Sequence, residues 1–133
     1  MNNNDNQKFK IDWIIHGVAD DEKDFMSYHT HGLDKHGMLE LELKIDFEPK
    51  QAYKFINLIA IHLIENKIII NEEDIIEGIF NTPIYFKKMK AINTMNELGF
   101  KTDVLRVVFQ DPNFLFPWEE GCHPAYKSQL DQL

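Results

Sequence analysis

Residues 38–46 read MLELELKID, and this stretch decides the fold more clearly than any other part of the chain. Apolar and charged residues alternate along it. The apolar set is Leu39, Leu41, Leu43 and Ile45, and the charged set is Glu40, Glu42, Lys44 and Asp46. Successive side chains of a strand point to opposite faces of a sheet. The alternation therefore predicts a strand with one apolar and one polar face.

Two further extended segments precede this strand. Residues 8–18 alternate through Phe9, Ile11, Trp13 and Ile15, and residues 25–33 resume an extended pattern after a polar turn at 20–23. A second tight connection follows at 34–37. Because parallel neighbours need a longer crossover, such short connections predict a three-stranded antiparallel meander.

A helix is expected next. Pro49 suits a first helical turn, where its missing N–H costs nothing. Ala52, Phe55, Ile56, Ile59 and Leu63 then recur at helical spacing and form one apolar stripe. Packing this stripe on the leucine face of residues 38–46 gives the predicted fold class: α+β, a mainly antiparallel sheet with one long helix on a face.

In the second half of the chain, the residue pattern predicts shorter helices and strands. We expect short strands at 67–71 and 75–80, a strand followed by helix or loop at 84–96, a strand at 104–109, and a short terminal helix at 124–132. With 133 residues the chain has room for one domain, which we place at residues 8–133 behind a disordered tail of residues 1–7.

Charge and composition exclude several classes of function. Asp and Glu number 22 against 14 Lys and Arg, a net charge of -8, and Arg106 is the one arginine. Duplex binding needs clustered cations, so nucleic acid is not expected as a partner. A single cysteine rules out an internal disulfide.

Location is also predicted from what the sequence lacks. The polar start of the chain carries no signal-peptide pattern, and the longest apolar stretch, residues 55–64, is far shorter than the ~20 residues of a membrane span. Abundant Ile, Lys and Asn are typical of an AT-rich bacterial coding sequence. We therefore expect a cytoplasmic bacterial protein without a membrane partner.

Several segments, taken in order, resemble a known family. They are YHTHGL at 28–33, HGMLEL at 36–41, VLRVVFQD at 104–111 and FPWE at 116–119. Their order and spacing are similar to those of the bacterial domain-of-unknown-function family 4262. Residues 38–39 are Met-Leu where that family has His-Pro, and Arg106 stands where glutamine is common.

The resemblance implies a small bacterial α/β domain with no established reaction. The positions of this chain that match the family are Thr30, Gly32, Leu33, Glu40, Pro117 and Trp118. Gly32 suits an unusual backbone angle or a close approach, and Pro117-Trp118 suits a rigid aromatic plug.

His29 and His31 are the strongest candidates for chemistry. Residues i and i+2 of a strand share a face, so both imidazoles project together, as zinc or another divalent metal requires. Glu40 on the neighbouring strand is the expected carboxylate ligand, and His36, His16 and His123 are further candidates. The alternative is a pair of surface histidines on a solvated sheet face.

Arg106 and the aromatic residues each allow two interpretations. Arg106 lies within an apolar strand, where it either binds an anionic ligand or pairs with Glu40, Glu42 or an aspartate across the sheet. Phe109, Phe116 and Trp118 are expected to form an aromatic cluster that closes a core or lines a ligand groove.

Two functions from different classes follow. The first is a non-catalytic binding domain, such as an immunity-type protein that captures a basic partner, with a protein partner or a homodimer. The second is a metal-binding domain or metal-dependent hydrolase that uses His29, His31 and Glu40, with a divalent cofactor such as zinc. Whether the protein is an enzyme stays open.

Overall fold

The computed structural model describes residues 11–20, 25–71, 73–95, 98–99 and 101–131, so the predicted tail at residues 1–7 lies outside it. A six-stranded sheet has the order β1-β2-β3-β6-β5-β4. Its strands are β1 (Ile14–Asp20), β2 (Phe25–His31), β3 (Glu40–Lys44), β4 (Ile75–Ile76), β5 (Ile84–Met95) and β6 (Lys101–Phe109). The helices are α1 (Pro49–Glu65) and the short α2 (Pro124–Lys127), with 3-10 turns η2 (Leu33–His36) and η3 (Ser128–Leu130).

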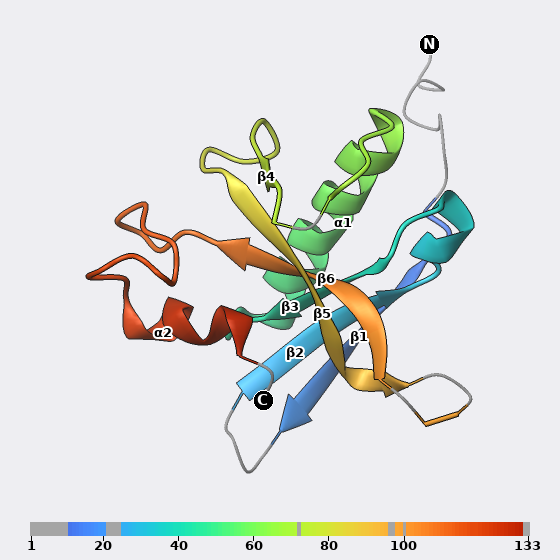
Figure 1. The fold of residues 1–133 in the computed structure, drawn as a ribbon, viewed down its shortest axis with the longest axis horizontal. Coiled ribbons are helices and arrows are strands. Elements are labelled where there is room, and N and C mark those ends of the chain that lie inside the picture. Colours follow the sequence, from blue (N-terminus) through green and yellow to red (C-terminus); the bar gives the residue numbers. More distant parts are fainter. Residues whose placement is uncertain (1–10, 21–24, 72, 96–97, 100, 132–133) are drawn as a thin grey trace.

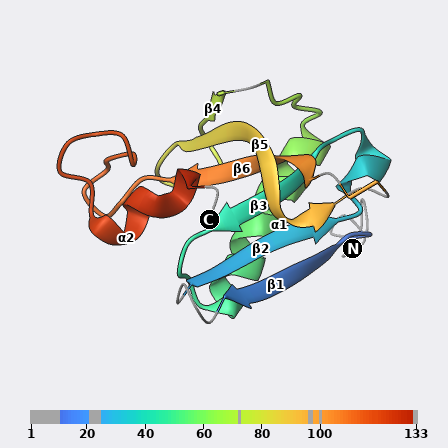
Figure 2. The ribbon, with the colours of Figure 1, turned by 60° about the horizontal axis from the view of Figure 1, so that its bottom comes forward.

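The predicted α+β fold is confirmed. Strands β1, β2 and β3 form the antiparallel meander, and α1 lies behind them across one face of the sheet (Figure 1; Figure 2). Leu41 and Leu43 of β3 and Ile56 and Ile59 of α1 are fully buried in one core. Burying each of these side chains contributes about 2 kcal/mol. None of the described helices could reach across a lipid bilayer as an apolar span.

Three predictions for the second half are wrong in whole or in part. Residues 84–96 were expected to leave the strand conformation midway, but β5 runs from Ile84 to Met95. It stays extended because it pairs with β6 through most of its length, with a register shift between Lys90 and Met95 where the strand bends (Figure 2). Residues 67–71 form no strand, and of residues 75–80 only Ile75–Ile76 pairs.

The pairing of β3 with β6 is parallel, in a sheet that is otherwise antiparallel. It places the polar face of β3 beside the one arginine of the chain, since Glu42 is opposite Arg106. The bent part of β5 reaches this face, because the Ile92 N–H donates to Glu42 Oε2 at 2.8 Å. The C-terminal turn reaches it too, through Gln129 and Asp131. The face without α1 is therefore polar and partly covered.

The expected aromatic cluster is divided between the two faces of the sheet. Phe109 joins the core under α1, with Phe47, Phe55 and Phe80 around it. Phe116 lies on the other face with Tyr85. The Trp118 ring stacks on the Phe116 ring, with 4.7 Å between the centroids and 12° between the ring planes. Adjacent residues of β6 point to opposite faces, so Val108 rather than Phe109 packs with Phe116.

Candidate metal centre

Three histidines of β1 and β2 meet on the polar face of the sheet. His16, His29 and His31 each place one ring nitrogen within 4.8 Å of the other two. The closest pair is His29 Nε2 and His31 Nε2, at 3.2 Å. The rings meet edge to face, with centroids 4.7–5.3 Å apart. Such a group can hold a divalent metal ion.

Strand geometry brings these side chains together. His29 and His31 share a face because they are two residues apart on β2. The register of β1 on β2 then places His16 directly opposite His29 and diagonal to His31. In this register Asp20 and Phe25 form the last pair, so the number of residues between them in the sequence decides which residue lies opposite His29. The length of the polar turn was therefore the signal that could have identified His16 as the third member.

His29 is the buried member of the group. Its side chain is almost fully buried, and its Nδ1 has no hydrogen-bond partner among the described residues. Burial, and then the charges of His31 and His16, lower the pKa of His29 to about 4. Its imidazole is therefore neutral at pH 7, which is the state that binds metal. His31 is partly exposed and His16 is exposed, so the site opens to solvent at β1, the edge strand.

The histidines lie at one end of a row of ionisable side chains across the sheet. His16 is opposite His29, His29 is opposite Glu42, and Glu42 is opposite Arg106. Arg106 was expected either to bind an anionic ligand or to pair with a carboxylate of the sheet, and the structure shows the ion pair. Arg106 Nη2 lies 2.7 Å from Glu42 Oε1, with both side chains buried. The charge of Glu42 is thus balanced by Arg106 and not by the histidines.

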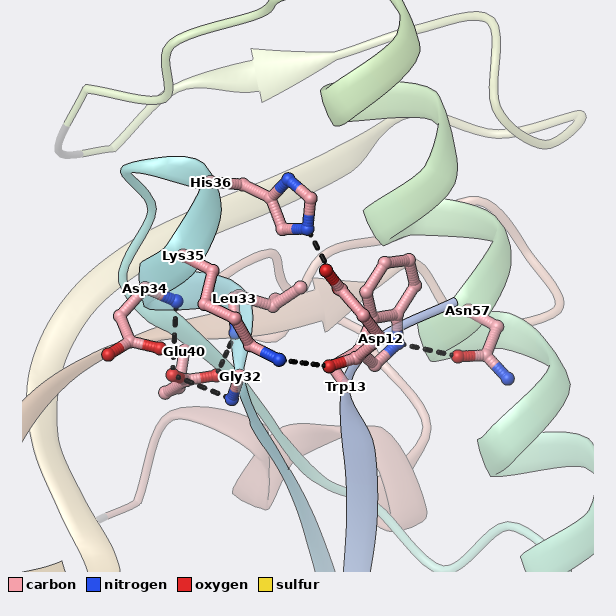
Figure 3. A network of polar contacts seen from close by, with 9 residues as sticks. All are labelled: Asp12, Trp13, Gly32, Leu33, Asp34, Lys35, His36, Glu40 and Asn57. Carbon is pink, nitrogen blue, oxygen red and sulfur yellow. Dashed lines mark hydrogen bonds and ion pairs between the residues drawn. The ribbon is translucent and has the colours of Figure 1, made fainter. Parts of the chain in front are cut away.

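Glu40 does not join the histidine group. Its carboxylate points into the turn after β2, where it accepts the N–H groups of Gly32, Leu33 and Asp34 at 3.1–3.4 Å (Figure 3). It also accepts the Thr30 hydroxyl at 2.8 Å, and that hydroxyl in turn accepts the Leu41 N–H. Four donors satisfy both carboxylate oxygens, so Glu40 holds the turn closed.

The same turn contains four of the residues on which the resemblance to family 4262 is based. Thr30, Gly32, Leu33 and Glu40 form one hydrogen-bonded unit. Gly32 has φ +118, and a Cβ there would lie 3.0 Å from the Trp13 Cα atom. Both reasons expected for glycine therefore apply: a left-handed backbone angle and a close approach. Trp13 is fixed in turn by its Nε1 donating to Asn57 of α1 at 2.8 Å (Figure 3).

The two other candidate histidines lie elsewhere. His36 Nε2 pairs with Asp12 Oδ1 at 2.8 Å beyond the end of β2 (Figure 3). His123 caps α2, and its Nδ1 accepts the Ala125 N–H at 3.0 Å. Among the described residues, His16 is therefore the only one of the candidates for a third ligand that lies beside His29 and His31.

Comparisons with known proteins add no relative: no family model, no curated protein and no solved structure matches this chain. The resemblance to family 4262 therefore stays a prediction from the residues quoted above.

Proposed function

We propose that this protein binds a divalent transition-metal ion, zinc in the first instance, through His16, His29 and His31. The observation that supports it best is the convergence of three imidazole nitrogens within 4.8 Å. Tetrahedral zinc, with Zn–N bonds of about 2.0–2.1 Å, separates its nitrogen ligands by about 3.3 Å. His29 and His31 already have this spacing, at 3.2 Å.

The third ligand needs only a small side-chain movement. A nitrogen at 4.8 Å must approach by about 1.5 Å to reach the tetrahedral spacing. His16 is exposed on the edge strand, so its ring can rotate without disturbing the core. Three neutral imidazoles suit zinc, copper and nickel better than calcium or magnesium, which prefer oxygen ligands.

The site supports metal binding more directly than catalysis. Three protein ligands leave a fourth position for water, as in catalytic zinc sites. Hydrolysis also needs a base, and the carboxylates of Glu40 and Glu42 are committed to other partners. The role of capturing a basic protein rests on net charge alone, so we place metal binding ahead of it.

A thermal-shift experiment tests the proposal. Zinc added to metal-free, untagged protein should raise Tm, because a ligand of the folded state alone stabilises that state. The increase should vanish in the double variant His29→Ala/His31→Ala. His62→Ala is the matched control, since His62 lies on α1, away from the group, and should leave the increase intact. The same increase in the double variant, or none in the wild type, would rule out this site.

A further inference from the structure

A pocket of about 390 Å³ lies on the opposite side of the sheet from the histidine group, where α1 ends. Its floor is formed by the buried side chains of Leu63 and Leu105. Met38, Leu39, Ile64 and Ile69 form its walls, drawn from the loop before β3, from α1 and from the segment after α1. This volume and an apolar lining are typical of a site for one small ligand.

Part of the apolar wall is exposed to solvent. Ile69 is 83% exposed and Leu39 is 37% exposed, although both line the pocket. Large apolar side chains gathered around a concave site mark a binding surface more often than isolated ones do. A ligand with an apolar body fits this wall.

The polar lining of the pocket carries one permanent charge, that of Lys67. Of the described lining residues, only His36 and Lys67 carry a polar side chain, and no carboxylate lines the pocket. This local balance is the reverse of the whole chain, which has a net charge of -8. Asp12 holds the His36 ring through Nε2, so Lys67 is the cation that an anionic group can approach directly.

The backbone at Lys67 supplies an independent observation. Lys67 has φ +53, a left-handed angle, just after the end of α1. Its N–H donates to the Ile64 carbonyl at 3.2 Å, and the Ile68 N–H donates to the Leu63 carbonyl at 2.9 Å. Glycine is the usual residue at this position of such a helix end, because other side chains are strained there. These two hydrogen bonds fix the backbone of Lys67 at the rim of the pocket.

We propose that this pocket binds an alkyl carboxylate of medium chain length, with the chain on the apolar wall and the carboxylate on Lys67 Nζ. The lining supplies apolar contact for the chain, and the one directly accessible cation supplies the charge partner. This site uses none of the metal-binding histidines, so it is independent of the proposed function.

Decanoate, titrated below its micelle concentration and followed by ¹H–¹⁵N NMR, tests the proposal. The amide signals of Leu39, Ile64 and Ile69 should shift with one saturable affinity. Acetate, which lacks the chain, should shift none of them, and decanol, which lacks the charge, should bind more weakly than decanoate. EDTA in the buffer removes any contribution from metal. Absence of saturable shifts at these residues, or equal binding of decanol and decanoate, would overturn the proposal.

Two variants of Lys67 separate charge from fold. Lys67→Met removes the ammonium and keeps the strained backbone, and it should weaken decanoate by about tenfold while leaving decanol unchanged. Lys67→Gly should weaken decanoate equally but raise Tm, because glycine relaxes the left-handed angle. Lys67→Arg should retain binding. Unchanged decanoate affinity in the Met and Gly variants would contradict a role for the Lys67 charge.

Discussion

Arg106 donates from Nε and Nη2 to the same oxygen of Glu42, at 2.9 and 2.7 Å, with both side chains completely buried. Around this pair, Glu42 Oε2 accepts the Ile92 N–H, and Arg106 Nη1 donates to the carbonyls of Gln129 and Asp131. One ion pair thus connects β3, β6, the bent part of β5 and the C-terminal turn.

The losses of stability caused by removing the two partners of this pair should not be additive. Arg106→Met leaves the Glu42 carboxylate buried without its cation, and Glu42→Leu leaves the guanidinium without its anion; each should lower the free energy of unfolding by about 3–5 kcal/mol. The double variant should cost clearly less than the sum, because no buried charge is left unpaired. Urea unfolding measures all three, and additive losses would argue against a coupled pair.

Leu41→Asp should abolish cooperative unfolding. Leu41 is fully buried between the sheet and α1, so the substitution places an unpaired charge in the core at a cost of several kcal/mol. Leu58→Asp is the matched control, because Leu58 is 41% exposed on α1 and should tolerate a carboxylate. Thermal melts followed by circular dichroism distinguish the two, and an unchanged melt for Leu41→Asp would contradict this packing.

The difference between these two leucines was largely visible in the sequence. Strict alternation placed Leu41 inside, and helical periodicity identified the stripe of α1 that covers it. The second half of β5 was not predictable in this way, because it depends on contacts that its own pattern does not show: the Ile92 N–H donates to Glu42 of β3, and Met95 pairs with Lys101 beyond a register shift. The parallel pairing of β3 with β6 depends likewise on residues far apart in the sequence.

At the candidate site, too, contacts between residues far apart in the sequence could not be predicted. Spacing alone placed His29 and His31 on one face, whereas His16 depends on the register of a neighbouring strand. Glu40 was expected on the polar face beside them, but its partners are mostly backbone N–H groups of a turn. Backbone donors leave no trace in the pattern of side chains, so a structural carboxylate and a ligand look alike in sequence.

Glu40→Gln should therefore destabilise the fold without weakening zinc binding. The amide lacks one acceptor oxygen, so either the N–H groups of Gly32 and Asp34, or the Thr30 hydroxyl and the Leu33 N–H, lose a partner. We expect a loss of about 1–3 kcal/mol in urea unfolding. Isothermal titration at a temperature where the variant is folded should give the wild-type zinc affinity. A large drop in affinity with unchanged stability would instead make Glu40 a ligand.

Metal-free protein should lose stability as the pH falls from about 6.5 towards 4. The folded-state pKa of His29 is about 4, below the ~6.5 of the unfolded chain, so the unfolded state binds more protons in this window. His29 accounts for up to about 3 kcal/mol of that loss. His29→Gln cannot titrate, so its stability should fall less steeply over the same range. Parallel pH profiles for wild type and variant would contradict a buried, neutral His29.

Isothermal titration of zinc into metal-free, untagged protein at neutral pH is the most direct measurement of the three-histidine centre. The proposed site predicts one ion per chain for the wild type and for His62→Ala, with affinity strongly reduced when His16, His29 or His31 is replaced singly by alanine. A wild type that takes up no zinc, or a His16→Ala variant that binds as tightly as the wild type, would contradict it.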